Sequence, residues 1–530
     1  MALTVRRAKR RAAALLLLAA LPLLYLSCAY AQREASRPLR AAAASGATVV
    51  TVKSGGDLQR ALDNARPGDE VVLEAGASFV GNFILPLKQG SAFITVRSSR
   101  ASELAEGRRV APDDAAKMAR VATPNAAPPF NAPPGSHHWR LVGLELTQTG
   151  RLDGYELVRL GDGDTAGPQT SADKAPHDIT IDRCYLHAFD DRTILKRGVT
   201  LNSAGTSLTN SYVSGVKSRE QEAQAVAGWN GPGPFTIENN YLEGSGINVL
   251  FGGAAPAIPN LVPSDITIRG NLLSKPLAWK GVWSAKNLLE LKSARRVNIT
   301  GNVLENSWPD AQTGWAVIFN VFGEDSTPDM IEDVTFSLNV VRNAANGINV
   351  RGMEATNARP RMRRVTVSDN LIDNVGAFGG EGKAFQVLNG TDSVAIDHNT
   401  VRGAVRVALI LEALPNQTHT GLSFTNNLLP HGDYGVFASG GALGTAVFEQ
   451  ASRRWKFAGN VLAGADARRY PPENLYPNAF GPDLFADAAR GDFRVRDPRF
   501  KGRGTDGRDP GCDFERLAAA TAWYAPPPGR

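Results

Sequence analysis

The chain has 530 residues, of which 43% are hydrophobic, 7% aromatic and 21% charged. These proportions exclude a disordered chain and a membrane protein with many spans. The formal net charge is +6, but residues 1–31 carry five basic residues and no acidic one. The rest of the chain is therefore close to neutral, and its charge does not indicate a nucleic-acid partner.

The N-terminal segment has the pattern of a secretory signal peptide. Basic residues precede an apolar run over 12–26, and Ala29-Tyr30-Ala31 is a small-x-small cleavage site. We expect cleavage after Ala31, a linker over 32–46, a secreted or periplasmic location and no membrane contact after cleavage. The apolar run is shorter than the ~20 residues of a membrane span. An uncleaved anchor and, through Cys28, a lipoprotein are the alternatives.

Residues 48–85 predict a strand, a short helix and a second strand. The helix covers residues 57–65 and is stopped by Pro67-Gly68. A helix at this position could cover the open end of a solenoid, which needs a cap to protect its core from water.

One phrase recurs along the rest of the chain: alternating apolar residues, then Asn, then one or two apolar residues. Ile266-Thr-Ile-Arg-Gly-Asn271-Leu-Leu is one copy. The alternation predicts a strand. The recurring position is held by Cys184, Ser211, Asn240, Asn271, Asn302, Asn339, Asn370, Asn399, Asn427 and Asn460, at intervals of 27 to 37 residues. A period of this length predicts a solenoid. Because Asn bonds readily to backbone groups, we expect these side chains to form an internal ladder.

A second short strand follows the Asn phrase in most repeats. Gly246-Ile-Asn-Val-Leu and Gly347-Ile-Asn-Val-Arg are examples. Short strands, one recurring turn residue and no long helical periodicity predict an all-β fold. We expect a parallel β-helix of about ten or more coils over residues 47–465.

Residues 466–530 are rich in Pro, Gly and charge, and predict a tail packed on the solenoid. The three cysteines, Cys28, Cys184 and Cys512, have neither metal-type spacing nor the number for a disulfide framework. Since a capped solenoid needs no partner to cover its ends, we expect a monomer.

Two phrases resemble a known group of proteins. Gly68-Asp-Glu-Val-Val-Leu-Glu-Ala-Gly76 resembles the start of the first coil in the pectate-lyase-like β-helix superfamily. Gly504-Thr-Asp-Gly-Arg-Asp-Pro-Gly511 resembles a tail phrase of many secreted bacterial β-helix proteins. The resemblance covers roughly residues 46–515. It implies a single-stranded right-handed helix and a polysaccharide partner, but no particular reaction, because one fold hosts many functions.

Candidate site residues come from aligning the second strands. The alignment predicts one outward row of Asn248, Glu290, Asn349 and Gln386, a second row containing Lys292 and Arg351, and Trp315 and Asn320 on the coil between them. In β-elimination from a uronic-acid polymer, a cation neutralises the substrate carboxylate and a Lys or Arg removes the adjacent proton. We therefore predict Lys292, Arg351 and Glu290 as catalytic and the other residues as substrate-binding, with Trp283, Trp308 and Trp315 available to stack on sugars. The alternative is an exposed salt bridge without function.

Two further resemblances bear on the reaction. Asn287-Leu-Leu-Glu290-Leu-Lys292-Ser293 is similar in outline to a phrase of chondroitin- and alginate-lyase-type enzymes, but its Glu-to-Lys spacing differs. Asp190-Asp191-Arg-Thr-Ile-Leu-Lys-Arg-Gly198 resembles a segment of polygalacturonases, which implies acid and base roles for the two acids. Asp190 and Asp191 are also candidate calcium ligands, or else turn residues.

The sequence thus predicts a secreted carbohydrate-active protein. The first hypothesis is a lyase acting on a uronic-acid polymer, with calcium as a possible cofactor. The alternatives are a polygalacturonase-type hydrolase and a β-helix that binds glycans, or serves a structural role, without cleaving them.

Overall fold

The computed structural model describes residues 46–321, 323, 328–353, 362–414 and 417–524. The predicted signal peptide and residues 32–45 of the predicted linker lie outside this range. No described helix is long and apolar enough to cross a bilayer. The described residues from Thr48 onward belong to one compact unit.

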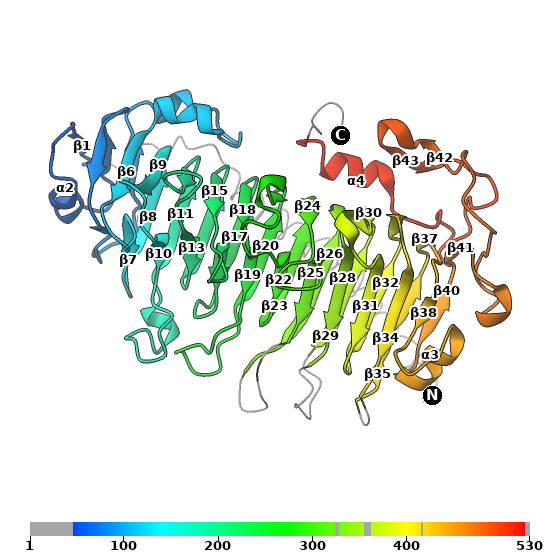
Figure 1. Ribbon diagram of the computed structural model, residues 1–530. Coiled ribbons are helices and arrows are strands. Elements are labelled where there is room, and N and C mark those ends of the chain that lie inside the picture. Colours follow the sequence, from blue (N-terminus) through cyan, green and yellow to red (C-terminus); the bar gives the residue numbers. More distant parts are fainter. Residues whose placement is uncertain (1–45, 322, 324–327, 354–361, 415–416, 525–530) are drawn as a thin grey trace, which may run out of the picture. The chain divides into compact units, whose positions relative to one another are not determined.

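Three parallel sheets form a right-handed β-helix, as predicted. From β2 to β34, each sheet takes every third strand in sequence order, so each of these coils gives one strand to each sheet (Figure 1). The complete sheets of 12 and 13 strands agree with the prediction of ten or more coils. The core runs through the interior of the coils, as a single cluster from Val52 to Tyr470.

The 16-stranded sheet begins each repeat with the strand of the Asn phrase. Its strands are β1 (Val49–Val52), β2 (Glu70–Leu73), β5 (Ile94–Ser98), β8 (His137–Val142), β11 (His177–Asp182), β14 (Ala204–Thr209), β17 (Phe235–Glu238), β20 (Ser264–Arg269), β23 (Ala294–Thr300), β26 (Ile331–Ser337), β29 (Met362–Ser368), β32 (Asp392–Asp397), β35 (His419–Thr420), β36 (Ser423–Thr425), β39 (Ser452–Arg453) and β40 (Lys456–Ala458).

The 13-stranded sheet follows directly after the Asn turn. Its strands are β3 (Ser78–Val80), β6 (Ala119–Thr123), β9 (Leu144–Gln148), β12 (Tyr185–His187), β15 (Tyr212–Val216), β18 (Tyr241–Gly244), β21 (Leu272–Ser274), β24 (Val303–Ser307), β27 (Val340–Ala344), β30 (Leu371–Val375), β33 (Thr400–Gly403), β37 (Leu428–Pro430) and β41 (Val461–Ala463).

The 12-stranded sheet contains the predicted second strands and carries the candidate site. Its strands are β4 (Phe83–Ile84), β7 (Phe130–Ala132), β10 (Gly154–Leu160), β13 (Leu195–Leu201), β16 (Gln224–Gly228), β19 (Ile247–Phe251), β22 (Asn287–Leu291), β25 (Trp315–Asn320), β28 (Asn346–Arg351), β31 (Lys383–Leu388), β34 (Val407–Glu412) and β38 (Gly435–Phe437).

The predicted asparagine ladder is confirmed. From Asn240 to Asn460, each side-chain amide donates to the Oδ1 of the next asparagine at 2.9–3.1 Å. The same Oδ1 atoms accept the backbone N–H groups of the preceding coil, as Asn302 does from Asn271 at 2.9 Å. Asn474, in the predicted tail, ends the row. The ladder therefore satisfies buried polar groups at the turn between two sheets.

Among the described residues, the α-helices lie in the N-terminal cap and in the last third of the chain. They are α2 (Leu58–Asn64), α3 (Thr445–Ala451) and α4 (Phe514–Ala520). Asp57 caps α2 by accepting the backbone N–H of Arg60, and Leu58 and Leu62 are buried in the core. The predicted capping helix is thus present within one residue of its expected bounds.

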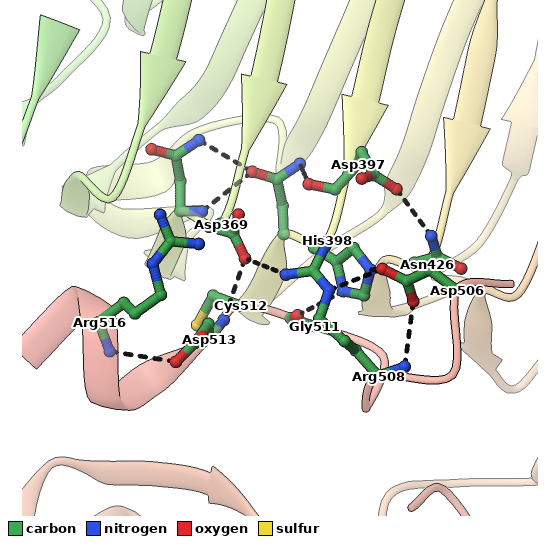
Figure 2. A network of polar contacts seen from close by, with 12 residues as sticks. Asp369, Asp397, His398, Asn426, Asp506, Arg508, Gly511, Cys512, Asp513 and Arg516 are labelled. Atoms are coloured by element: carbon green, nitrogen blue, oxygen red, sulfur yellow. Dashed lines mark hydrogen bonds and ion pairs between the residues drawn. The ribbon is translucent and has the colours of Figure 1, made fainter. Parts of the chain in front are cut away.

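The C-terminal segment lies against the solenoid. It contains an antiparallel pair, β42 (Phe485–Asp487) and β43 (Asp492–Val495), before α4. Leu371 of β30 packs with Phe493 and Leu517. Figure 2 shows the polar contacts: the Asp369 carboxylate accepts the backbone N–H of Asp513 at 3.2 Å, and the His398 ring lies 3.1 Å from the Gly511 carbonyl oxygen. Both anchoring residues occupy the turn that precedes the ladder asparagine.

Candidate functional site

The outer face of the 12-stranded sheet brings together most of the residues predicted from the sequence. Strand register places Glu290, Ile318, Asn349 and Gln386 side by side on successive coils. Asn320 pairs with Arg351 on the next coil. Lys292 directly follows β22, the neighbouring strand on the coil before Asn320. The predicted rows are therefore present for these residues, although the register does not test their roles.

The predicted place of Asn248 in this row is wrong. Register puts Leu250 beside Glu290. Asn248 is fully buried, where its Oδ1 accepts from the ammonium of Lys275 at 3.0 Å and its amide donates to the carbonyl of Leu242 at 2.7 Å. All five residues of β19 are buried, so the apolar pattern does not reveal which of them face outward.

Glu290 and Lys292 form an ion pair beneath the surface, with Nζ 3.6 Å from Oε1. Only 2% of Glu290 is exposed, and its other oxygen accepts from Asn287 at 2.9 Å. Burial raises the pKa of Glu290, while the charge of Lys292 opposes that shift. Burial would also raise the pKa of neighbouring Glu222, but its hydrogen bond from Lys286 and the charge of Lys292 outweigh burial and lower it. The cluster is thus a compact set of two carboxylates and two ammonium groups.

Several buried polar atoms on this face lack a hydrogen-bond partner among the described residues. They are Asn287 Oδ1, Ser293 Oγ, Asn320 Oδ1, Asn349 Oδ1 and Arg351 Nε. Buried polar groups in folded proteins are nearly always bonded to protein, water or ligand. These five atoms are therefore available to bond water or a polar ligand.

A pocket of about 400 Å³ opens on the same face, on coils nearer the N-terminus. It is lined by Tyr155, Glu156, Arg159, Gly161, Asp162, Gly163, Asp164, Arg197, Thr200, Asn202 and Trp229. The Arg197 guanidinium lies 5.2 Å from the ring centroid of Tyr155 and 4.7 Å from that of Trp229. A cation next to two aromatic rings suits a sugar that carries a carboxylate, because a ring can stack on the sugar while the guanidinium pairs with the acid.

Neighbouring groups fix the pocket's walls. Arg197 donates to Gln224 at 2.9 Å, and the Trp229 indole donates to the Gly163 carbonyl at 3.0 Å. A Cβ at Gly163 would lie 2.2 Å from the Trp229 ring, so only glycine allows this packing. Arg159 and Thr200 both bond the buried Glu156 carboxylate. The aromatic and cationic groups are therefore held before any ligand arrives.

Tyr155 is the pocket's candidate for proton transfer. Its hydroxyl oxygen accepts from the Lys196 ammonium at 3.0 Å, and 41% of the residue is exposed. Partial burial would raise the pKa of Tyr155, but the Lys196 hydrogen bond and the Arg197 charge outweigh it and lower the pKa below the ordinary value. The sequence alignment missed this residue because it began at the coil of Asn248. The available signal was the presence of Tyr155, Glu156 and Arg159 in the otherwise apolar strand Gly154–Leu160.

The predicted sugar-stacking tryptophans occupy other environments. Trp308 is 1% exposed and packs with Trp279 and Trp283, so the prediction that its ring faces a sugar is wrong. Trp315 is 5% exposed at the start of β25. Trp283 is partly exposed. The tryptophan that lines the pocket is Trp229, which the sequence analysis did not single out.

Asp190 and Asp191 lie in the turn between β12 and β13. The Asp190 carboxylate is bonded by Arg151 and accepts from the Thr193 hydroxyl at 2.8 Å. The Arg151 contact holds the pKa of Asp190 well below its ordinary range. Among the residues that the structure describes, neither acid belongs to a cluster of three groups placed to share a metal ion. The predicted calcium and hydrolase roles of this pair remain predictions.

No protein-family model matches the sequence, and no curated protein matches it. Among solved structures, the chain is similar to an alginate lyase from Paenibacillus sp. str. FPU-7, with 14% identity, a TM-score of 0.32 and coverage of 81% of this chain and 98% of that one. It is also similar to a pectate lyase, with 13% identity, a TM-score of 0.33 and coverage of 88% of this chain and 95% of that one. A mutant tailspike protein of E. coli bacteriophage HK620, in complex with a pentasaccharide, has 10% identity and a TM-score of 0.40, with coverage of 79% of this chain and 74% of that one. At these values the likeness carries no argument about activity, and the fold assignment rests on the three sheets themselves.

Proposed function

We propose that this protein binds an acidic polysaccharide on the outer face of the 12-stranded sheet and cleaves it by β-elimination. The observation that carries the proposal is the pocket in which Arg197 lies over both Tyr155 and Trp229. The pocket holds a uronic-acid residue, with the sugar against the rings and its carboxylate on Arg197 and Arg159.

The pocket supplies the groups that β-elimination needs. Neutralising the carboxylate acidifies the adjacent C–H. Tyr155, as the phenolate that Lys196 and Arg197 stabilise, takes that proton. The electron pair of the broken C–H bond forms a C=C double bond, and the glycosidic oxygen leaves with its bonding pair. That oxygen then takes a proton from Tyr155 or from water, so atoms and charges balance.

Lys292 and Arg351, predicted from the sequence as catalytic, bind farther along the same polymer in this proposal. They lie on later coils of the same face, beside Asn349 and Gln386. Successive coils are about 4.8 Å apart, so a chain running along the solenoid axis meets a new set of side chains on each coil. Glu290 orients Lys292 through their ion pair.

The test is a panel of pectate, alginate, chondroitin, heparin-like and neutral glycans, each with calcium or with a chelator. Ultraviolet absorbance of the unsaturated product and reducing ends are followed together. The proposal expects both signals on a uronic-acid polymer. Reducing ends without absorbance would show hydrolysis and contradict it. Glycan binding without either signal would show that the protein binds the polymer but does not cleave it, and would contradict the cleavage step of the proposal.

A further inference from the structure

Three histidines and an aspartate meet on the outside of the 16-stranded sheet, away from the proposed sugar face. His137 and His138 begin β8, and His177 and Asp178 begin β11 on the next coil. His137 and His177 are direct partners in the register of the two strands. Four side chains that can ligate or orient a metal ion therefore come together from two sequence segments 40 residues apart.

Backbone conformation explains why consecutive side chains share one side of the sheet. In a regular strand, neighbouring side chains point to opposite faces. Here His138 and Asp178 adopt the left-handed conformation, with φ of 59° and 52°, and each side chain meets that of the residue before it. The His137 and His138 Nδ1 atoms lie 2.7 Å apart, and His177 Nδ1 lies 2.8 Å from Asp178 Oδ2. The following coil has Gly205 beside Asp178, where a Cβ would lie 2.8 Å from its carboxylate.

Three of these residues offer converging ligand atoms. Those of His138, His177 and Asp178 all lie within 4.8 Å of one another. His138 Nε2 is 3.7 Å from Asp178 Oδ2, and the three side chains are 17%, 38% and 46% exposed. Zinc binds imidazole nitrogen and carboxylate oxygen at about 2.0–2.2 Å, so small side-chain rotations bring all three atoms onto one ion. The exposed side leaves room for water as a further ligand.

His137 has the geometry of a positioning residue. When the Nδ1–H of His138 donates to Nδ1 of His137 at 2.7 Å, the lone pair of His138 Nε2 remains available on the side of Asp178. Metal-binding histidines usually donate their second N–H in this way, which fixes the tautomer and ring orientation. The His137 ring also stacks on His177, with centroids 4.8 Å apart and planes 14° apart, and Phe93 packs edgewise on His138 at 5.1 Å.

We propose that His138, His177 and Asp178 bind a divalent transition-metal ion of the zinc class, with His137 positioning His138. Two imidazoles and one carboxylate are ligands that suit zinc, copper or nickel rather than calcium or magnesium. The site is independent of polysaccharide cleavage, and its test does not depend on activity.

The experiment measures zinc binding by calorimetry, using chain purified without a histidine tag. We expect one zinc ion per chain and a rise in Tm on zinc addition. His177→Gln and Asp178→Asn should each weaken binding at least about 100-fold and abolish the rise in Tm. His431→Gln, a histidine bonded to Tyr470 on a distant coil, is the matched control and should bind as the wild type does.

The positioning role has its own readout. His137→Phe keeps a ring to stack on His177 but cannot accept the hydrogen bond from His138 Nδ1–H, so zinc affinity should fall about 10- to 100-fold. His137→Asp restores an acceptor and should recover most of the affinity. Circular dichroism of each variant establishes that it is folded. Wild-type zinc affinity in both His177→Gln and Asp178→Asn, or failure of the folded wild type to bind zinc, would overturn the proposal.

Discussion

Tyr155 illustrates how one contact sets the chemistry of a residue. Its base form is favoured because the ammonium of Lys196 lies 3.0 Å from the phenolic oxygen. A general base must be deprotonated, so turnover should increase as the pH rises through the pKa of Tyr155, which lies below the ordinary 10.0. Lys196→Met removes the stabilising charge. We expect the rising limb of the pH profile of kcat/KM to move to higher pH in that variant, and an unmoved limb would exclude Tyr155 as the base.

His419 makes the fold sensitive to acid. The ring is buried, with Nδ1 accepting the backbone N–H of Thr391 at 3.1 Å and Nε2 donating to the Glu412 carbonyl at 2.9 Å. Burial lowers the pKa of His419 to about 4. Between pH 6.5 and 4 the unfolded chain therefore binds a proton that the folded chain does not, so the free energy of unfolding should decrease as the pH falls through that window.

His419→Gln is the matched test, because glutamine can accept and donate in the same places without titrating. Urea unfolding at several pH values should show a shallower loss of stability below pH 6.5 in this variant. Equal slopes in wild type and variant would show that His419 contributes nothing to the acid response.

The site residues differ in how well the sequence alone predicts them. Glu290, Asn349 and Gln386 stand out because each is a polar residue within a short apolar strand, and their register follows from the repeat. The position of Asn248 could not be predicted, because all five residues of its strand are buried and the pattern does not distinguish the inner from the outer face of the sheet. The four residues of the proposed metal site are invisible in sequence because their convergence depends on positive φ angles and on register across a coil.

The asparagine ladder is the element on which coil-to-coil pairing depends. Asn302 Oδ1 accepts both the backbone N–H and the side-chain amide of Asn271, and its own amide donates to the Ile268 carbonyl. Asn302→Ala leaves these buried groups unpaired, at about 1–3 kcal/mol for each unsatisfied group. We expect a loss of roughly 3 kcal/mol or more in urea unfolding. Asn298→Ala, an exposed asparagine on β23, is the control and should change little. Similar losses for both would contradict a special role for the ladder.

At the scale of the whole molecule, the sequence repeat predicts the coils. The position of the tail depends instead on contacts between residues that are distant in the sequence. The intervals of 27 to 37 residues and the two recurring strands predict a parallel β-helix. The third strand of each coil, which follows the Asn turn, was not predicted. Phe493 and Leu517 pack against Leu371, which lies more than 120 positions earlier in the chain. No periodic pattern in the sequence predicts this contact. The sequence therefore predicts that a tail exists but not where it attaches.

Asp369 tests that attachment. Its carboxylate bonds the backbone N–H of Asp513 and lies 3.5 Å from Arg508 (Figure 2). Asp369→Ala should loosen the segment that ends in α4 and speed its cleavage in limited proteolysis, while the coils remain intact. Asp392→Ala, on the exposed side of β32, serves as the control. Unchanged cleavage in Asp369→Ala would show that apolar packing alone holds the tail.

We propose that the outer face of the 12-stranded sheet cleaves an acidic polysaccharide by β-elimination, with Tyr155 as the base. The decisive measurement is the initial rate of unsaturated product, followed by ultraviolet absorbance, in wild type, Tyr155→Phe and the control Tyr434→Phe. Tyr434 is an exposed tyrosine at the other end of the solenoid. We expect at least a 100-fold loss of rate in Tyr155→Phe and none in Tyr434→Phe. Wild-type turnover in Tyr155→Phe, or no unsaturated product from any uronic-acid polymer, would contradict the proposal.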